Sequence, residues 1–109
     1  MMKGNVDEAI DALRRSVAAQ PLFCVGQYRL GLAYEKKGEL SLSREALTKA
    51  LETEVAECKK LQDAFDARGR VAMKLGQTEE ARADFSRCRD VAATTRVGQR
   101  CAAQLRSLQ

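Results

Sequence analysis

The chain has 109 residues, of which 45% are hydrophobic and 31% are charged, a length and composition typical of one globular domain. Its 19 Lys and Arg exceed its 15 Asp and Glu by four, a mild excess that a solvated surface explains without nucleic-acid binding. Because the sequence has no His, His-ligated metal sites and His-based acid–base catalysis are excluded.

The N-terminal region carries a helix start signal. Asn5 and Glu8 form a capping box, and the amphipathic pattern that follows runs to about Ala19, with Pro21 just beyond it. No apolar stretch here resembles a secretory signal. The sequence therefore predicts either a cytosolic protein or a fragment whose export signal is missing, and the organisation of the chain favours the fragment.

Five more helices are predicted along the chain. The first four span about 23–37, 40–53, 56–75 and 78–91. Gly38 and Gly76 end the first and third of these, as glycine commonly does at a helix C-terminus. The final helix spans about 95–108 and has apolar residues at helical spacing from Val97 to Leu108. No segment predicts a strand, so the fold class is expected to be all-α.

The sequence repeats itself with a period of 34 and then 38 residues. Small and large apolar positions recur together at these offsets, as Ala9, Ser43 and Ala81 and as Leu13, Leu47 and Phe85. The 38-residue step adds four residues, which is close to one helical turn of about 3.6 residues. We therefore expect one helix of the longer repeat to gain a turn while keeping its buried face.

This repeat resembles the tetratricopeptide repeat (TPR) family. The period of 34, the string Leu30-Gly31-x-x-Tyr34 and the string Ala9-x-x-x-Leu13 leading to Pro21 carry the resemblance. It implies a TPR-like α-solenoid, a right-handed superhelix of antiparallel helix pairs. The chain divides into a half repeat (1–21), a repeat (22–56), a longer repeat (57–93) and a C-terminal capping helix (95–108). We interpret this as the C-terminal part of a longer array.

The four cysteines have spacings that fit no compact zinc site. Cys88 and Cys101 flank a turn and lie at the same height of an antiparallel helix hairpin, so a disulfide between them is expected. Cys24 and Cys58 each open a first helix and are expected to pair as well, although the four-residue insertion lies between them. Two bridges suit an exported protein, and four buried thiols in a cytosolic protein are the alternative.

Cysteine placement extends the resemblance. The features that carry it are Phe23-Cys24 before Tyr28-Arg29-Leu30-Gly31-Leu32-Ala33-Tyr34, the Cys58 that opens the longer repeat, and Phe85-Ser86-Arg87-Cys88 leading to Gly98-x-x-Cys101. They resemble the C-terminal repeats of the pilotins of the Tgl and PilF/PilW type. These are outer-membrane TPR lipoproteins that support assembly of the type IV pilus secretin.

The pilotin resemblance implies a protein-binding scaffold for secretin subunits at the periplasmic face of the outer membrane, needed for pilus-dependent social gliding motility. It implies no cofactor. The lipidated N-terminal Cys of that family is absent here, so membrane attachment would depend on an anchor outside this chain. A cytosolic TPR adaptor that binds a soluble protein partner is the alternative.

TPR arrays bind through the concave surface lined by the first helix of each repeat. The lining positions predicted here are Val25, Tyr28, Leu32, Glu35, Asp63, Asp66, Arg70 and Lys74. Tyr28 and Leu32 are candidate anchors for an apolar segment, with packing against a neighbouring helix as the alternative. Arg70 and Lys74 lie four residues apart and are candidates to meet an acidic partner, with an ordinary solvated face as the alternative.

The remaining charged residues suggest no further chemistry. TPR co-chaperones that grip a C-terminal carboxylate place Lys and Asn at the matching columns, and this chain lacks that set. On the capping helix, Arg96, Gln99, Arg100 and Arg106 are expected on the outer side. No nucleophile–base motif, phosphate-binding loop or converging set of acids is present in the sequence. We expect no enzyme activity, no metal and no nucleic-acid partner.

Overall fold

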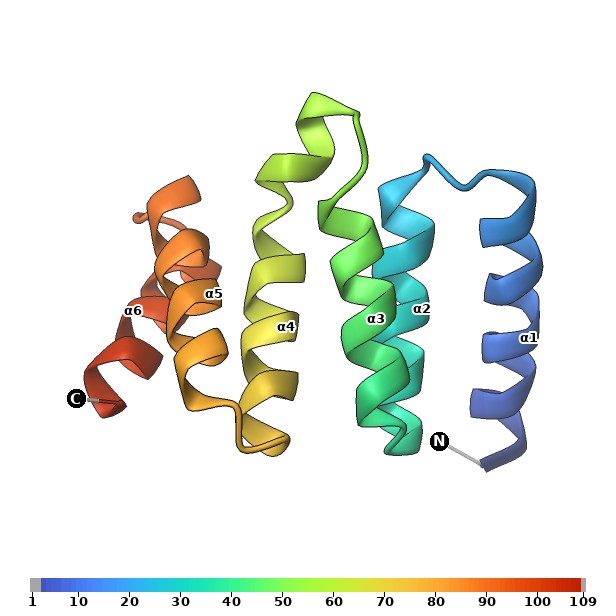
Figure 1. Ribbon diagram of the computed structural model, residues 1–109, viewed down its shortest axis with the longest axis horizontal. Helices are drawn as coiled ribbons and strands as arrows, with labels where there is room; N and C mark the ends of the chain where they lie inside the picture. Colours follow the sequence, from blue (N-terminus) through green and yellow to red (C-terminus); the bar gives the residue numbers. More distant parts are fainter. Residues whose placement is uncertain (1–2, 109) are drawn as a thin grey trace.

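The computed structural model describes residues 3–108 of the chain, and the side chains of residues 5–108. Within these residues it contains α-helices and one short 3-10 helix, but no strand (Figure 1). The elements in order are α1 (Lys3–Ala19), α2 (Cys24–Lys37), α3 (Leu40–Leu51), η1 (Ala56–Lys60), α4 (Gln62–Lys74), α5 (Thr78–Val91) and α6 (Arg96–Ser107). The all-α prediction is confirmed.

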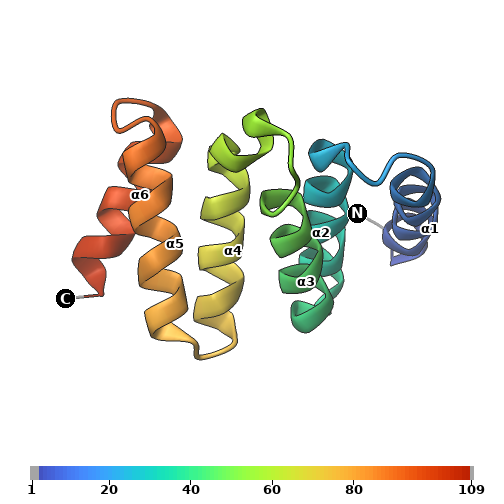
Figure 2. The same cartoon turned by 45° about the horizontal axis from the view of Figure 1, so that its top comes forward.

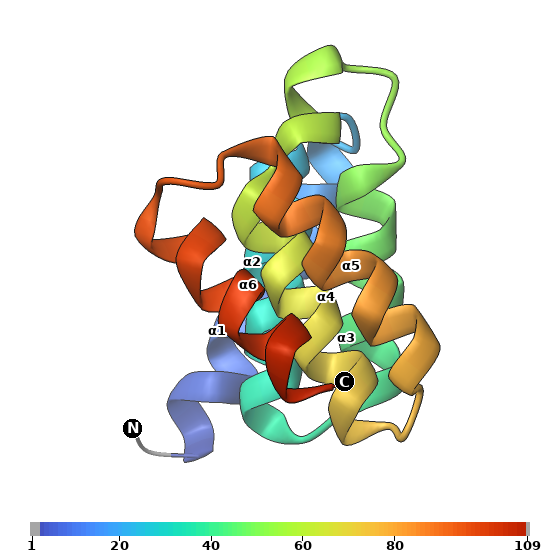
Figure 3. The ribbon, with the colours of Figure 1, turned by 90° about the vertical axis from the view of Figure 1, so that its left-hand side faces the viewer.

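Consecutive helices run antiparallel and stand side by side along the long axis of the molecule (Figures 1 and 2). The pairs α2–α3 and α4–α5 pack most extensively, and α2 also contacts α4, which in turn contacts α6. Viewed along the array, α3 and α5 lie on one side of α2 and α4, while α6 lies on the other (Figure 3). None of the described helices has the length and apolar character needed to cross a membrane.

In each complete repeat, a large apolar side chain of the second helix packs onto a glycine of the first helix. A Cβ built on Gly31 of α2 would lie 2.6 Å from Cγ of Leu47, and one on Gly69 of α4 would lie 2.7 Å from the Phe85 ring. Leu47 and Phe85 are essentially inaccessible to solvent. Ser43 adds a hydrogen bond of 2.7 Å from its hydroxyl to the Gly31 carbonyl oxygen. The positions that recur in the sequence therefore form the same helix–helix contact in both complete repeats.

Two sequence expectations are wrong. The helix α1 already includes Lys3, so Asn5 is an interior position and cannot cap the N-terminus as the capping box requires. The predicted helix 56–75 is interrupted at Leu61, whose ψ of 87° is not helical, and it divides into η1 and α4. Because α2 and α4 have 14 and 13 residues, the four-residue insertion lengthens the connection and not the helix.

The cysteines form two disulfides, Cys24–Cys58 and Cys88–Cys101, and none is free. The first joins the start of α2 to η1 across 34 residues, so the inserted residues are what carries Cys58 back to Cys24. The second joins α5 to α6 across 13 residues and is fully buried. Both pairs are those that the sequence analysis expected to meet.

The amide side chain of Gln62, the first residue of α4, connects α4 to the turn between α5 and α6. Its Nε2 donates to the carbonyl oxygens of Cys88 and Ala92 at 2.8 and 3.0 Å, and its Oε1 accepts from the Thr95 hydroxyl at 2.9 Å. Gly98 allows this closure, because a Cβ there would lie 2.1 Å from the Ala92 carbonyl oxygen. The last turn of α5 and the first turn of α6 are thus held by one residue of α4.

Replacing Gly31 tests the recurring contact. We expect Gly31→Leu to overpack the α2–α3 interface and to lower the free energy of unfolding by about 1–3 kcal/mol, measured by urea unfolding. Gly26 is a matched control on the same helix, since a Cβ there meets nothing closer than 3.6 Å. We expect Gly26→Ala to be neutral or stabilising, because alanine favours a helix over glycine. Equal stabilities of the two variants would contradict this packing.

Removing the buried disulfide tests its contribution to stability. We expect the double variant Cys88→Ala with Cys101→Ala to lose about 3 kcal/mol of unfolding free energy, because a short cross-linked loop no longer restricts the unfolded chain. Thiol counting on denatured, unreduced protein should find no free thiol in the parent and none in the variant. Four free thiols in parent protein from an oxidising compartment would contradict the two bridges.

Candidate protein-binding groove

The predicted lining residues fall into a charged group and an apolar group. The charged group is brought together across three helices: Glu35 from α2, Asp66, Arg70 and Lys74 from α4, and Arg100 from α6. We call these five residues the groove ladder. Four of them are predicted lining residues, and the structure adds Arg100. Asp63, the other charged residue predicted to line the groove, is exposed and forms no ion pair in the described part of the chain.

Each of the two carboxylates of the groove ladder accepts hydrogen bonds from two cationic side chains. Arg70 donates to both oxygens of Glu35, from Nε and Nη2, at 2.8 Å each, and Lys74 donates to Glu35 at 3.1 Å. Asp66 accepts from Arg70 at 3.3 Å and from Arg100 at 2.7 Å. These ion pairs connect α2 to α4 and α4 to α6, so they set the spacing of the three helices.

Acids and cations of the groove ladder differ in exposure. The side chains of Glu35 and Asp66 are 10% and 6% exposed, whereas those of Arg70, Lys74 and Arg100 are 40–51% exposed. The negative charges therefore lie beneath the positive ones. A partner approaching the groove meets the cationic groups first, although each of them is already paired.

The charge pairing changes the pKa of Glu35 and Arg70. The hydrogen bonds that Arg70 donates are the main reason that the pKa of Glu35 is lowered, against the opposing effect of burial. The same hydrogen bonds raise the pKa of Arg70. Both groups are therefore held in their charged forms at neutral pH.

Tyr28 lies beside the groove ladder, half-buried. It packs against three buried clusters, which include Ala50 with Cys58, Leu47 with Ala67, and Ala64 with Phe65. Burial, followed by the charge of Asp63, raises the pKa of its hydroxyl, which stays neutral at physiological pH. Its ring is therefore fixed in place and part of it remains accessible.

Two other predicted positions contribute less to the groove. Leu32 packs with Leu47 and Val71 and also lines a small apolar cavity of about 140 Å³ between α1 and α2. Val25 is half-buried near the start of α2. For Leu32, packing against the neighbouring helices accounts for the position.

Two expectations about arginines are corrected. Arg100 was expected on the outer side of the capping helix, but it bonds to Asp66 of α4. Arg70 was expected to hold a partner's carboxylate, but its planar fork is occupied by Glu35. Both corrections have one cause: a buried carboxylate must be paired, and Arg70 of α4 and Arg100 of α6 supply the cations for Glu35 and Asp66.

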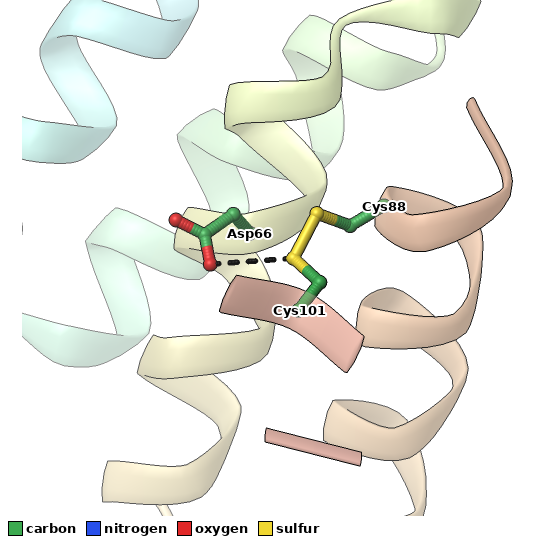
Figure 4. A group of neighbouring side chains, drawn as sticks. All are labelled: Asp66, Cys88 and Cys101. Carbon is green, nitrogen blue, oxygen red and sulfur yellow. Dashed lines mark hydrogen bonds between the residues drawn. A yellow bond between two sulfur atoms is a disulfide. The ribbon is translucent and has the colours of Figure 1, made fainter. Parts of the chain in front are cut away.

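The Asp66 carboxylate also faces the Cys88–Cys101 disulfide. Its Oδ1 lies 3.5 Å from Sγ of Cys101 (Figure 4). A disulfide sulfur has no proton to donate, so this is a close contact and not a hydrogen bond. These three residues place ligand atoms within 4.8 Å of one another, but sulfurs that are bonded to each other are not thiolates that a metal could bind.

The other buried acid is structural as well. Asp84 of α5 is 4% exposed and accepts two hydrogen bonds from Arg68 of α4, at 2.9 and 2.7 Å. Arg68 also donates to the Thr48 hydroxyl at 3.3 Å. This bidentate ion pair connects α4 to α5, which the sequence analysis related only through their recurring apolar positions. Its spacing of 16 residues matches no local sequence pattern.

The chain matches the model of a known protein family. The family model described as "Tetratricopeptide repeat" matches residues 26–54 and 62–93. The chain belongs to the tetratricopeptide repeat family. These two segments contain the α2–α3 and α4–α5 pairs, each with its glycine contact. No curated protein sequence matches the chain.

Solved TPR domains share the fold. The first TPR domain of Spaghetti (RPAP3), bound to the HSP90 peptide SRMEEVD, is 22% identical, with a TM-score of 0.84 over 97% of this chain and 79% of that one. The TPR domain of Arabidopsis OM64 is 17% identical, with a TM-score of 0.82 over 95% of this chain and 83% of that one. At these identities the likeness shows the fold alone.

The pKa of Glu35 gives a pH-dependent prediction. Because this pKa is lowered from its ordinary 4.5, the charge of Glu35 stabilises the fold above that pH, and the stabilisation is lost as the pH falls through the lower folded value. We expect Glu35→Gln to cost about 1–3 kcal/mol at pH 7, where charge-assisted hydrogen bonds are lost.

The difference between parent and Glu35→Gln should narrow as the pH decreases below 4.5, in urea unfolding series at several pH values. Glu57→Gln is the control, since Glu57 is exposed and forms no ion pair in the described part of the chain. A constant difference at all pH values would show that Glu35 acts through packing and not through its charge.

Proposed function

We propose that this TPR domain is a protein-binding scaffold that holds a partner segment in the groove between α2, α4 and α6 and performs no chemistry. The groove ladder is the observation that carries the proposal. Its ion pairs fix α2, α4 and α6 relative to one another, so little conformational freedom remains to be lost when a partner binds. Its exposed side is cationic and adjoins the ring of Tyr28.

The chemistry of the groove favours a partner segment with an apolar side chain next to an acidic one. Tyr28 offers an aromatic surface with a polar end, which is typical of residues that dominate binding energy. Arg100 engages Asp66 through one nitrogen, Nη2, and its side chain is 51% exposed. Arg100 is therefore better placed than Arg70 to meet a carboxylate.

We infer further that the partner is a secretin subunit and that the domain acts as a pilotin at the periplasmic face of the outer membrane. Two features support this. The first is the resemblance carried by cysteine placement. The second is that all four cysteines lie in bridging positions, an arrangement that suits an oxidising compartment. Attachment to the membrane would come through a lipid anchor outside this chain.

A cytosolic adaptor is the second candidate. The solved domain of RPAP3 contains an acidic HSP90 peptide, and the exposed cations of the groove ladder would also attract acidic segments. The Lys and Asn set of the carboxylate-gripping co-chaperones is absent here, so a different contact pattern would be needed. Free thiols in protein isolated from its native compartment would favour this candidate over the pilotin.

The test introduces Tyr28→Ala and Arg100→Ala separately into the full-length protein. We expect both variants to fold and at least one to lower the yield of secretin multimers and pilus extension, because a few anchors dominate such interfaces. Arg29→Ala on α2 and Arg106→Ala on α6 are matched controls, since both residues are exposed and neither forms an ion pair within residues 5–108.

The possible results separate the parts of the proposal. Normal multimers from both groove variants would remove the groove from the mechanism. Normal multimers in cells lacking the whole protein would contradict the pilotin function, while leaving the protein-binding role of the domain to be tested with a different partner.

A further inference from the structure

A second cavity lies where η1 and the start of α4 meet the C-terminal half of α5. It has a volume of about 450 Å³ and is lined by Lys59, Lys60, Phe65, Arg87, Asp90 and Val91. We call it the Phe65 cavity. Phe65 is 5% exposed, whereas Val91 at the rim is 38% exposed. Because Phe65 precedes Asp66 by one residue, it points about 100° around α4 from the groove ladder.

The charges around the Phe65 cavity are unbalanced. Lys59, Lys60 and Arg87 form no ion pair in the described part of the chain. The guanidinium carbon of Arg87 lies 6.0 Å from the centre of the Phe65 ring. Asp90, the acidic residue of the lining, is already paired with Arg89 at 3.0 Å. The lining therefore holds three cations and one acid above the buried Phe65 ring, and its charge is positive.

Equivalent positions in the first complete repeat also line a cavity, but its chemistry differs. The positions 38 residues before Phe65 and Arg87 hold Gln27 and Lys49, which border a cavity of about 240 Å³ together with Glu45, and Lys49 is paired with Glu45 at 3.2 Å. Lys59 and Lys60 belong to η1, which is the segment formed by the four-residue insertion. The two lysines and the aromatic residue of the lining are therefore specific to the longer repeat, although a cavity at this place is not.

A covalent bond fixes the two lysines in position. Cys58 directly precedes Lys59 and is bonded to Cys24 at the start of α2, so η1 is tethered at its centre. Leu61 then begins the hydrogen bonding of α4, with its carbonyl oxygen accepting from the Ala64 amide at 3.0 Å. The backbone that carries the two lysines is thus anchored on both sides.

The lining determines which ligand fits. A carboxylate gains charge-assisted hydrogen bonds from Lys and Arg, and an apolar side chain beside it is stabilised by covering Val91, which is 38% exposed. A phosphate backbone would use the cations but leave the apolar surface exposed to water. Glu52, Glu54 and Glu57 precede the lysines in the same connection and disfavour a long polyanion.

We propose that the Phe65 cavity is a second binding site, for an acidic protein segment. The segment places a carboxylate among Lys59, Lys60 and Arg87 and an adjacent apolar side chain over Val91. The site is separate from the groove, so it does not depend on what the groove binds. A domain with both sites brings two segments together on two different faces of α4.

The test is a titration of isotope-labelled protein with the peptide acetyl-Gly-Asp-Phe-Glu-Gly-amide, followed by NMR. We expect chemical-shift changes centred on residues 59–65 and 87–91 that weaken as salt is added, because exposed charges are screened. Arg87→Gln, and separately the double variant Lys59→Gln with Lys60→Gln, should weaken binding by about threefold to tenfold. Lys49→Gln, at the position equivalent to Arg87, should bind as the parent does.

Control peptides separate charge from apolar contact. Replacing both acids by Asn and Gln, or replacing Phe by Gly, should each weaken binding by about threefold or more. Equal binding of the neutral peptide would overturn the proposal, as would unchanged affinity in both cation variants or shifts confined to the groove. Tighter binding of an oligouridine than of the acidic peptide would overturn the assignment to a protein segment.

Discussion

The close approach of two helices at a glycine is the constraint on which the rest of this structure depends. Gly31 against Leu47 and Gly69 against Phe85 bring the helices of each pair together at the same height. Because this contact recurs, α2 and α4 stand in equivalent places along the array. Side chains 35 residues apart in sequence, such as Glu35 and Arg70, can then form a bidentate pair. The groove follows from the spacing of the helices.

Ion pairs between helices add to the apolar packing in fixing how the helices are arranged. Moving an ionised carboxylate away from water is costly unless strong hydrogen bonds replace its hydration. Each of the carboxylates Glu35, Asp66 and Asp84 is almost fully buried and bonded to at least one arginine. Asp66 joins α4 to α6, and Asp84 joins α5 to α4. These pairs align the helices at particular heights, which apolar contacts alone define less sharply.

Much of the fold could be predicted from the sequence, because the repeat columns report local contacts. Gly31 and Leu47 recur with their neighbours, and Gly38 and Gly76 end helices with φ of 91° and 76°. The place of the four inserted residues could not be predicted, since a helix longer by one turn and a longer connection give the same spacing. The structure resolves this at Leu61, which leaves the helical conformation while Cys58 bonds to Cys24.

The candidate site was only partly predictable. Helical spacing identified the face of α4 that carries Asp66, Arg70 and Lys74, but not what each side chain binds. Arg100 lies on a helix outside the repeat columns, so its pairing with Asp66 depends on how α6 docks. The docking of α6 depends in turn on Gln62, whose role no local pattern signals, because its partners are 26 to 33 residues away.

The positions of the two bridges have a mechanical consequence. If the chain were pulled from its ends, tension would pass through the Cys24–Cys58 bond and bypass α2 and α3, which lie inside that loop. The Cys88–Cys101 bond would likewise relieve the turn between α5 and α6. The load would fall on the segments outside the two loops: α1, the stretch from Cys58 to Cys88 with α4 and nearly all of α5, and the end of α6 beyond Cys101. Of the two complete repeats, the second would therefore yield first, and both of the domain's surfaces on α4 would lose their shape under force before α2 and α3 came apart.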